Sequence, residues 1–274
     1  MAFVENQGAR IYWDEQGSGA PLLLIMGLGW TSHAWYRTRP LLSAKYRTIA
    51  MDNRGVGRSD APPGPYSIAQ MASDAAAVLA AAKVNTAHIF GVSMGGMIAQ
   101  EFALQYPPKV RSLILGCTSA GGPEAVRADQ AALQVLMTRS PNPDEFTKAI
   151  SRFIYDRGTP PERIAEDTEV RRKWYPTSDA YSAQLQAILA WEAYTRIAKI
   201  AAPTLLIHGE KDQLVPAENG KMIAARIPGA KLVLLPDASH IFITDQTEAA
   251  HAAILEFLGA QATRQRERLA PVRD

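Results

Sequence analysis

Residues 91–96, GVSMGG, constrain the fold of this chain more than any other part of the sequence. A strand-like run, 87–92, leads into this stretch, and a helix-forming run, 97–103, follows it. The pattern G-x-S-x-G predicts a sharp turn from a strand into a helix, with the serine in a strained conformation and its hydroxyl lifted clear. Glycine is needed at positions 91 and 95, because a Cβ there would collide with the adjacent strand and helix. A glycine-rich turn with an incidental serine has the same pattern, so the other catalytic groups must be found independently.

A serine hydroxyl is a weak nucleophile at neutral pH, so Ser93 needs a base nearby. Among the five histidines, His240 lies in a loop that follows the apolar run 231–235. Loops at strand ends are where a rigid scaffold presents catalytic groups. Simpler roles, in strand packing, beside a glycine turn or on a helix surface, account for the others: His88, His208, His33 and His251.

The acid that would orient this histidine is predicted to be Asp212. It follows the apolar run 204–208, and Pro216 stands where the next helix should begin. Asp237 is the main rival, but it shares a short loop with the histidine and would struggle to approach the imidazole edge-on. Glu210 is a weaker rival, whose simpler role is that of a solvated loop carboxylate.

The chain order Ser93, Asp212, His240 is expected when three loops converge at the carboxyl edge of one parallel sheet. Such a site also needs backbone N–H donors for the oxyanion. The glycine turn at 26–30, MGLGW, can direct N–H groups toward a carbonyl oxygen, although glycine turns are common in themselves. The second donor is predicted to be the N–H of Met94, at a helix start where the helix dipole favours negative charge.

With these motifs in place, the chain resembles the α/β-hydrolase family from about residue 3 to about residue 258. Residues 51–60, MDNRGVGRSD, resemble the family's loop after its fourth strand. Residues 202–216 resemble the segment that bears its acid, and 237–240 resemble its histidine loop. The resemblance implies an α/β-hydrolase fold and a serine hydrolase that needs no metal and no organic cofactor. Members with serine at this turn are mostly carboxylic-ester hydrolases, with lactonases, perhydrolases and carbon–carbon bond hydrolases nearby.

The chain departs from the family where many relatives have His-Gly and it has Met26-Gly27, which makes one wall of the pocket more apolar. The resemblance implies that the first oxyanion donor is the N–H of Leu28. Dehalogenases and epoxide hydrolases place aspartate at the position of Ser93, so their chemistries are not expected. Carbon–carbon bond hydrolases commonly have asparagine where this chain has Val92. Enol-lactonases share much of the general pattern.

Composition agrees with a single α/β domain that carries an insertion, since the chain has 274 residues and 47% hydrophobic content. A net charge of +2 gives no electrostatic reason to expect nucleic-acid binding. No signal-peptide pattern and no membrane-spanning run is evident, so we expect no membrane partner. The single cysteine, Cys117, excludes an internal disulfide and fits a reducing compartment, so we expect a cytoplasmic protein. A homodimer is left open.

Seven strand-like runs alternate with helical runs and predict a mostly parallel central sheet with helices on both faces. These runs are Ala9–Glu15, Pro21–Met26, Tyr46–Asp52, Ala87–Val92, Val110–Gly116, Thr204–His208 and Lys231–Leu235. The alternation breaks at 121–197, where helical patterns and prolines occur and where relatives insert a helical cap. We therefore expect a core of 1–120 and 198–260, a helical cap at 121–197 and a flexible C-terminal tail at 261–274.

The large side chains of the cap suggest an apolar substrate pocket, although packing is the simpler role for any one of them. We expect the pocket to include Trp30, Met137, Trp191 and Ile241. The basic run 171–173, RRK, could bind an anionic substrate, but a solvated helix face explains it more simply.

These observations predict a serine hydrolase that cleaves small to medium, largely apolar carboxylic esters through an acyl-enzyme. The partner is then a small-molecule ester or lactone substrate. Three alternatives remain: a lactonase of the enol-lactonase kind, a perhydrolase or cofactor-free haloperoxidase, and a non-catalytic ligand receptor that uses the same pocket.

Overall fold

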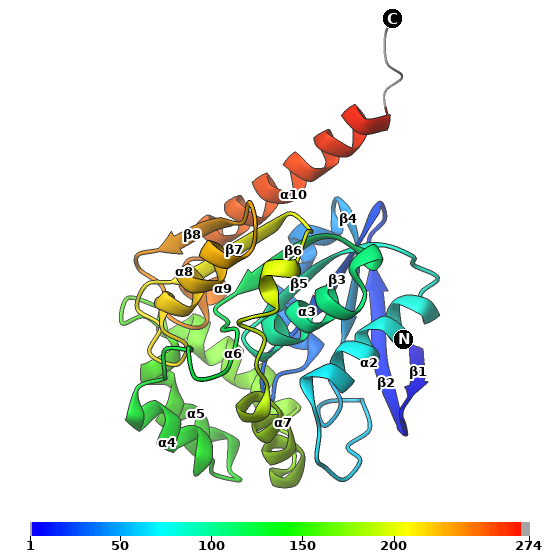
Figure 1. The fold of residues 1–274 in the computed structure, drawn as a ribbon. Coiled ribbons are helices and arrows are strands. Elements are labelled where there is room, and N and C mark those ends of the chain that lie inside the picture. Colours follow the sequence, from blue (N-terminus) through cyan, green and yellow to red (C-terminus); the bar gives the residue numbers. More distant parts are fainter. Residues whose placement is uncertain (1, 270–274) are drawn as a thin grey trace, which may run out of the picture.

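The computed structural model describes residues 2–269 and is built around an eight-stranded sheet (Figure 1). The strands are β1 (Ala2–Asn6), β2 (Ala9–Gln16), β3 (Ala20–Ile25), β4 (Tyr46–Met51), β5 (Ala87–Val92), β6 (Val110–Gly116), β7 (Thr204–Gly209) and β8 (Lys231–Leu235). Their order in the sheet is β1-β2-β4-β3-β5-β6-β7-β8. The pairings β1–β2 and β2–β4 are antiparallel, and the pairings from β4 through β8 are parallel.

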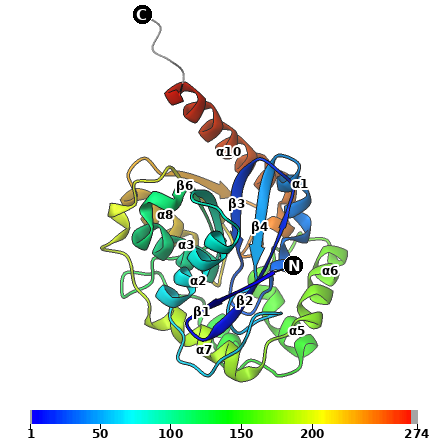
Figure 2. The same ribbon diagram turned by 90° about the vertical axis from the view of Figure 1, so that its right-hand side faces the viewer.

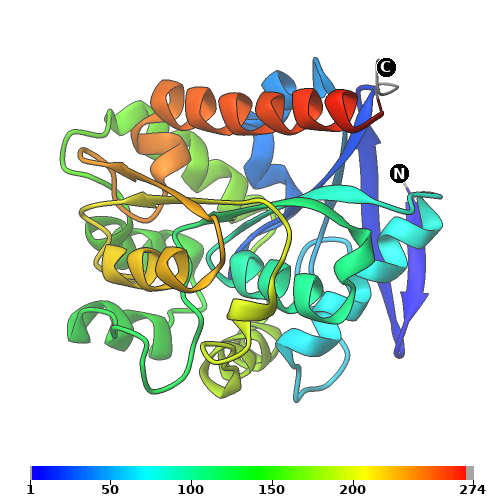
Figure 3. The same cartoon turned by 45° about the horizontal axis from the view of Figure 1, so that its top comes forward.

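Helices cover both faces of the sheet, which explains why the parallel strands are continuous apolar runs in the sequence. In β3, Leu23 and Ile25 pack on one face, while Leu22 and Leu24 pack on the other. The first face is covered by α2 (Ile68–Ala81), α3 (Met94–Gln105) and α8 (Ala217–Arg226). The second is covered by α1 (Arg39–Ser43), α9 (Phe242–Asp245) and α10 (Thr247–Leu269). Figure 3 shows α10 lying across the sheet.

All seven expected strands are present, and the structure adds β1 at the edge of the sheet. Figure 2 shows the β1–β2 hairpin in dark blue at this edge. Residues 261–269, which we expected in a flexible tail, continue α10 as helix; the rest of that segment, 270–274, lies outside the described residues. Within residues 2–269, no helix combines the length and the apolar character that crossing a membrane requires.

Four helices lie between β6 and β7, in the segment that we expected to form a cap. They are α4 (Gln130–Met137), α5 (Pro143–Ile154), α6 (Pro161–Lys173) and α7 (Ser178–Ala190). None of the eight strands falls in this segment, and the helices gather together at the bottom of Figure 1. A small apolar cluster, which includes Phe146, Ile150 and Tyr181, packs α5 against α7.

Candidate active site

Ser93 stands at the turn from β5 into α3 with φ +57° and ψ −122°, a conformation that residues other than glycine rarely adopt. The flanking glycines allow this turn. A Cβ on Gly91 would lie 2.1 Å from the carbonyl oxygen of Gly95, and a Cβ on Gly95 would lie 2.1 Å from that of Ile25. The Ser93 N–H donates to the Gly116 carbonyl at 2.8 Å, which ties the turn to β6. The strained serine turn predicted from G-x-S-x-G is therefore present.

Asp212 and His240, from the loops after β7 and β8, meet in a buried hydrogen bond. The imidazole Nδ1 of His240 lies 2.7 Å from Asp212 Oδ2. The other carboxylate oxygen, Oδ1, accepts from the N–H groups of Leu214 and Val215 at 2.9 and 2.8 Å. A carboxylate can only accept, so Nδ1 carries the proton and Nε2 is left as the basic nitrogen.

The charge of Asp212 is maintained although both partners are buried. Burial by itself would raise the pKa of this carboxyl, but the neighbouring His240 charge, the hydrogen bond from His240 and the His208 ring, whose Nε2 lies 3.5 Å from Oδ2, hold it at about 2. Asp212 is therefore ionised at neutral pH and can stabilise a positive charge on His240. The two rival carboxylates are exposed: Asp237 pairs with Lys211 at 3.0 Å, and Glu210 faces solvent.

The glycine turn after β3 packs directly against Ser93. A Cβ on Gly27 would lie 2.9 Å from Ser93 Cβ and 3.4 Å from its Oγ. Among the described residues, the N–H of Leu28 has no protein acceptor. The N–H of Met94 begins α3, and the first N–H groups of a helix have no acceptor within it. Both predicted oxyanion donors therefore remain free beside the serine.

A cavity of about 460 Å³ joins these groups. It is bordered by Ser93, His240, Leu28 and Met94, and by the expected pocket residues Trp30 and Ile241. The hydrogen bonds of the described residues include none between Ser93 and His240. Catalytic hydrogen bonds of this kind are often long without substrate and shorten when the complex forms.

The comparison with known proteins agrees with this arrangement. A family model described as the α/β hydrolase fold matches residues 20–247. The chain belongs to the α/β-hydrolase family. It is 31% identical to the "Putative carbamate hydrolase RutD" of Azorhizobium caulinodans, over 94% of this chain and 98% of that protein. It is also 32% identical to a poly(3-hydroxyalkanoate) depolymerase of Ectopseudomonas oleovorans, over 92% of this chain and 88% of the depolymerase.

A solved structure extends the comparison to esterases. A thermophilic esterase from Thermogutta terrifontis superposes with a TM-score of 0.83 at 25% identity, covering 95% of this chain and 98% of the esterase. The expected family, the expected fold class and a hydrolytic activity of the α/β-hydrolase kind are thereby confirmed.

Two of the expected pocket residues of this hydrolase do not border the cavity, and their assignment was wrong. Met137 is the last residue of α4 and is 61% exposed, because α4 turns Leu133 and Leu136 toward the cavity instead. Trp191 is buried in the main core, where its Nε1–H donates to Glu101 Oε2 at 2.8 Å.

One residue of the hydrolase that sequence analysis missed lies behind the glycine turn. Gln184 of α7 is fully buried, and its Oε1 accepts from the Gly29 N–H at 2.9 Å. Its Nε2 donates to the Arg54 carbonyl at 2.7 Å. A lone glutamine within a helical pattern carries no local signal for this role, since it reads as a solvated position.

Within the described residues, one cluster has side chains of the types that bind metals. The Sγ of Cys117, an oxygen of Asp212 and a ring nitrogen of His240 lie within 4.8 Å of one another. Burial raises the pKa of the Cys117 thiol well above its ordinary value, and the thiolate is the form that ligates metals. The donor set therefore suits a hydrogen-bonded acid–base pair backed by a neutral thiol better than it suits a metal ion.

Proposed function

We propose that this hydrolase cleaves carboxylic esters through an acyl-enzyme, with Ser93 as nucleophile, His240 as general base and Asp212 as the residue that orients it. The observation that supports this most directly is the 2.7 Å hydrogen bond between His240 and Asp212. The imidazole of His240 borders the same cavity as the strained Ser93. The same geometry would act on a lactone, whose released alcohol stays attached to the acid.

In the proposed mechanism, Ser93 Oγ attacks the carbonyl carbon while His240 Nε2 takes the hydroxyl proton. The N–H groups of Leu28 and Met94 stabilise the oxyanion, and Asp212 stabilises the imidazolium. The intermediate collapses and expels the alcohol, which receives the proton from His240. Water then attacks the acyl carbon as His240 removes its proton, and the second collapse releases the acid and restores Ser93.

The cavity suits a substrate of small to medium size with a largely apolar acyl or alcohol part. Its volume of about 460 Å³ falls within the usual range of small-molecule sites. Two relatives are named a poly(3-hydroxyalkanoate) depolymerase and an esterase, which supports ester cleavage. The relative named a carbamate hydrolase makes a carbamate a necessary member of the substrate panel.

The decisive experiment compares Ser93→Ala, His240→Ala and the wild type on p-nitrophenyl acyl esters, short-chain lactones and a carbamate. Each variant should lose at least about 10³-fold in kcat, because the nucleophile and its base act as a unit. A fluorophosphonate probe should label the wild type and the His251→Ala control but not Ser93→Ala. His251→Ala is the matched control, since His251 contacts Thr38 outside the cavity.

Wild-type activity or probe labelling in Ser93→Ala would refute the assignment. The alternatives give different results in the same assays. A receptor would retain its ligand without turnover, and a perhydrolase would oxidise halide when peroxide and acetate are supplied.

A further inference from the structure

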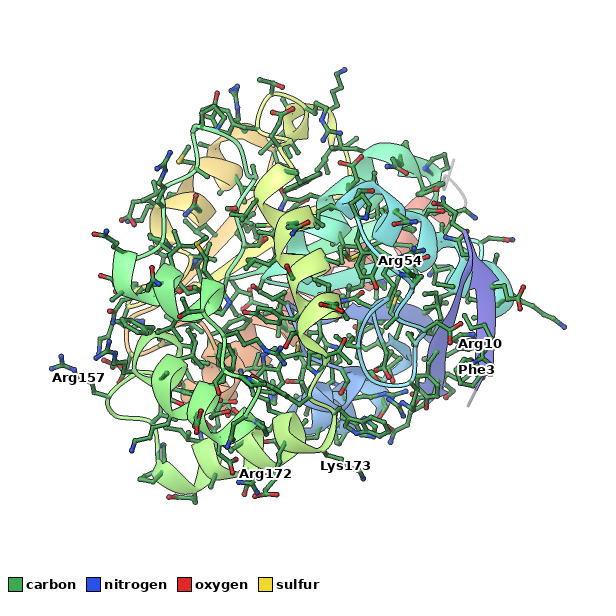
Figure 4. The ribbon with its side chains drawn as sticks, turned by 90° about the horizontal axis from the view of Figure 1, so that it is seen from below. Phe3, Arg10, Arg54, Arg157, Arg172 and Lys173 are labelled. Carbon is green, nitrogen blue, oxygen red and sulfur yellow. The ribbon has the colours of Figure 1, made fainter. Side chains whose placement is uncertain are left out.

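The basic run at the end of α6 does not form one solvated face. Arg171 is buried, at 8% exposure, and borders the catalytic cavity. Figure 4 places Arg172 and Lys173 at the outer edge of the molecule, where both are exposed. Arg172 pairs there with Asp144 at 2.8 Å. The interpretation as a solvated face is therefore wrong for one of the three residues, the one that faces the proposed reaction.

The guanidinium of Arg171 has no polar partner in the described part of the chain. It donates no hydrogen bond, no carboxylate lies within 4.0 Å, and Nη1 is buried without an acceptor. Its Cζ lies 4.2 Å from the centre of the Trp30 ring and 5.3 Å from that of Phe146. Aromatic faces offset only part of the cost of removing a cation from water. The desolvation is evident in the pKa of Arg171, which burial lowers from its ordinary value.

The one carboxylate that borders the cavity in the described residues cannot serve as a full counter-charge. Asp167 lies one helical turn before Arg171, and Arg37 Nε lies 3.7 Å from its Oδ1. Its oxygens also accept, at 2.6 to 2.9 Å, from the hydroxyls of Tyr36, Tyr155 and Thr244. The acceptor capacity of Asp167 is thus used by other groups, and the positive charge of Arg171 is left facing the cavity.

A second donor stands near this cation. Tyr181 borders the same cavity, and its hydroxyl is buried and has no protein partner in the described structure. The Tyr181 ring meets Phe146 edge-on at 6.1 Å, and the same Phe146 ring contacts Arg171. The cap thus adds two buried donors without a protein partner, one of them charged, to a wall that is otherwise mostly apolar; Arg127, which also borders the cavity, is exposed to solvent.

We propose that Arg171, assisted by Tyr181, binds a carboxylate of the substrate, so that the preferred substrates are esters or lactones that carry a free carboxylate away from the scissile carbonyl. The planar guanidinium can hold a carboxylate with two parallel hydrogen bonds, which are strong in a site sheltered from water. The substrate carboxylate would supply a negative charge beside Arg171, where no described side chain supplies one. This inference rests on the proposed function, because it assigns the second end of the substrate for the reaction at Ser93.

The test uses pairs of ethyl esters of equal length. Monoethyl esters of linear dicarboxylic acids, from adipate to sebacate, are compared with ethyl esters whose far end is a neutral carboxamide, by release of ethanol. The measured quantity is the ratio of kcat/KM for the acid to that for the amide. We expect a wild-type ratio of about tenfold or more for at least one length. Arg171→Met should lower that ratio about 10- to 100-fold, the usual effect of a charge-assisted hydrogen bond.

Arg171→Lys keeps the charge without the two-pronged geometry and should lose only part of the preference. Arg172→Met is the matched control from the next position and should retain the wild-type ratio. A wild-type ratio of one or less at every length overturns the inference, and this arm holds even if Arg171→Met does not fold. An unchanged ratio in folded Arg171→Met overturns it as well. Ser93→Ala separates the two proposals: if it abolishes turnover of both esters, the proposed function stands whatever the ratio does.

Discussion

Ser93 and its surroundings illustrate how single residues enforce the geometry of the site. A non-glycine residue in a sparsely populated conformation costs about 1–3 kcal/mol. Here hydrogen bonds on both sides of the residue hold that conformation: the Ser93 N–H donates to the Gly116 carbonyl, and the Ser93 carbonyl accepts from Thr118 Oγ1 at 2.8 Å and from N–H groups in the first turn of α3. Asp245 likewise fixes the backbone beside a catalytic candidate. Its Oδ2 accepts from the N–H of Ser239 at 2.7 Å, in the loop that carries His240.

Asp245 also makes the stability of the fold depend on pH. Burial raises the pKa of this carboxyl to about 6, despite hydrogen bonds from Thr159, Ser239 and Asp156. The folded state therefore binds a proton that the unfolded state releases near its ordinary value of 3.8. The stabilisation is complete below about pH 4 and is lost as pH rises through 6. Asp245→Asn removes this titration, so its stability relative to wild type should rise by about 1–3 kcal/mol from pH 4.5 to 7.

Urea unfolding at the two pH values measures this difference. Asp237→Asn serves as the control, because it removes an exposed carboxylate from the loop that carries His240 and should shift stability by less than about 0.5 kcal/mol. If the Asp245→Asn and wild-type stabilities stay parallel across this range, Asp245 is not the titrating group.

At the scale of elements, helix α7 connects the cap to the glycine turn that carries Leu28, the first proposed oxyanion donor. Gln184 reaches from α7 to the Gly29 N–H, one residue beyond Leu28. The sequence could predict that 121–197 is helical, since proline punctuation and apolar spacing are local signals. It could not predict which side of each helix faces the cavity, because that rotation depends on distant packing. Met137 and Arg171 were both misjudged for this reason.

Gln184→Ala should lower kcat about 10- to 100-fold with little change in KM. The substitution frees the glycine turn, so an oxyanion donor that acts mainly in the transition state is displaced; outright loss of such a donor costs about 10²–10³-fold. Affinity for a trifluoromethyl ketone, which forms the same oxyanion, should fall in parallel. Gln186→Ala, an exposed position on the same helix, is the control. A rise in KM with kcat and ketone affinity intact would show that Gln184 shapes the pocket only.

At the scale of the whole molecule, one buried ion pair links segments that are distant in the chain. Arg54, in the loop after β4, meets Asp74 of α2 with two hydrogen bonds of 2.7 and 2.6 Å. Asn6 at the end of β1 donates to the same carboxylate at 2.8 Å. The Arg54 carbonyl accepts a hydrogen bond from Gln184 Nε2 of the cap. Residues 51–60 could be matched to a family loop from sequence, and the serine turn and the acid–base pair followed from local patterns. A pairing with α2, 20 residues away, leaves no such pattern.

Removing one member of this pair should be costlier than removing both. Asp74→Asn leaves the Arg54 cation, at 1% exposure, without its partner, and should lower the free energy of unfolding by about 3–5 kcal/mol. Arg54→Met is the second single variant, and the double variant Arg54→Met with Asp74→Asn removes both buried charges. The double variant should cost less than the sum of the two single changes. Asp60→Asn breaks the exposed pair with Arg10 and should cost less than about 1 kcal/mol. Chemical unfolding of the four variants and the wild type closes the cycle. Additive single and double effects would mean that the pair does not act as a unit, and that the N-terminal hairpin, α2 and the cap are held together by apolar packing instead.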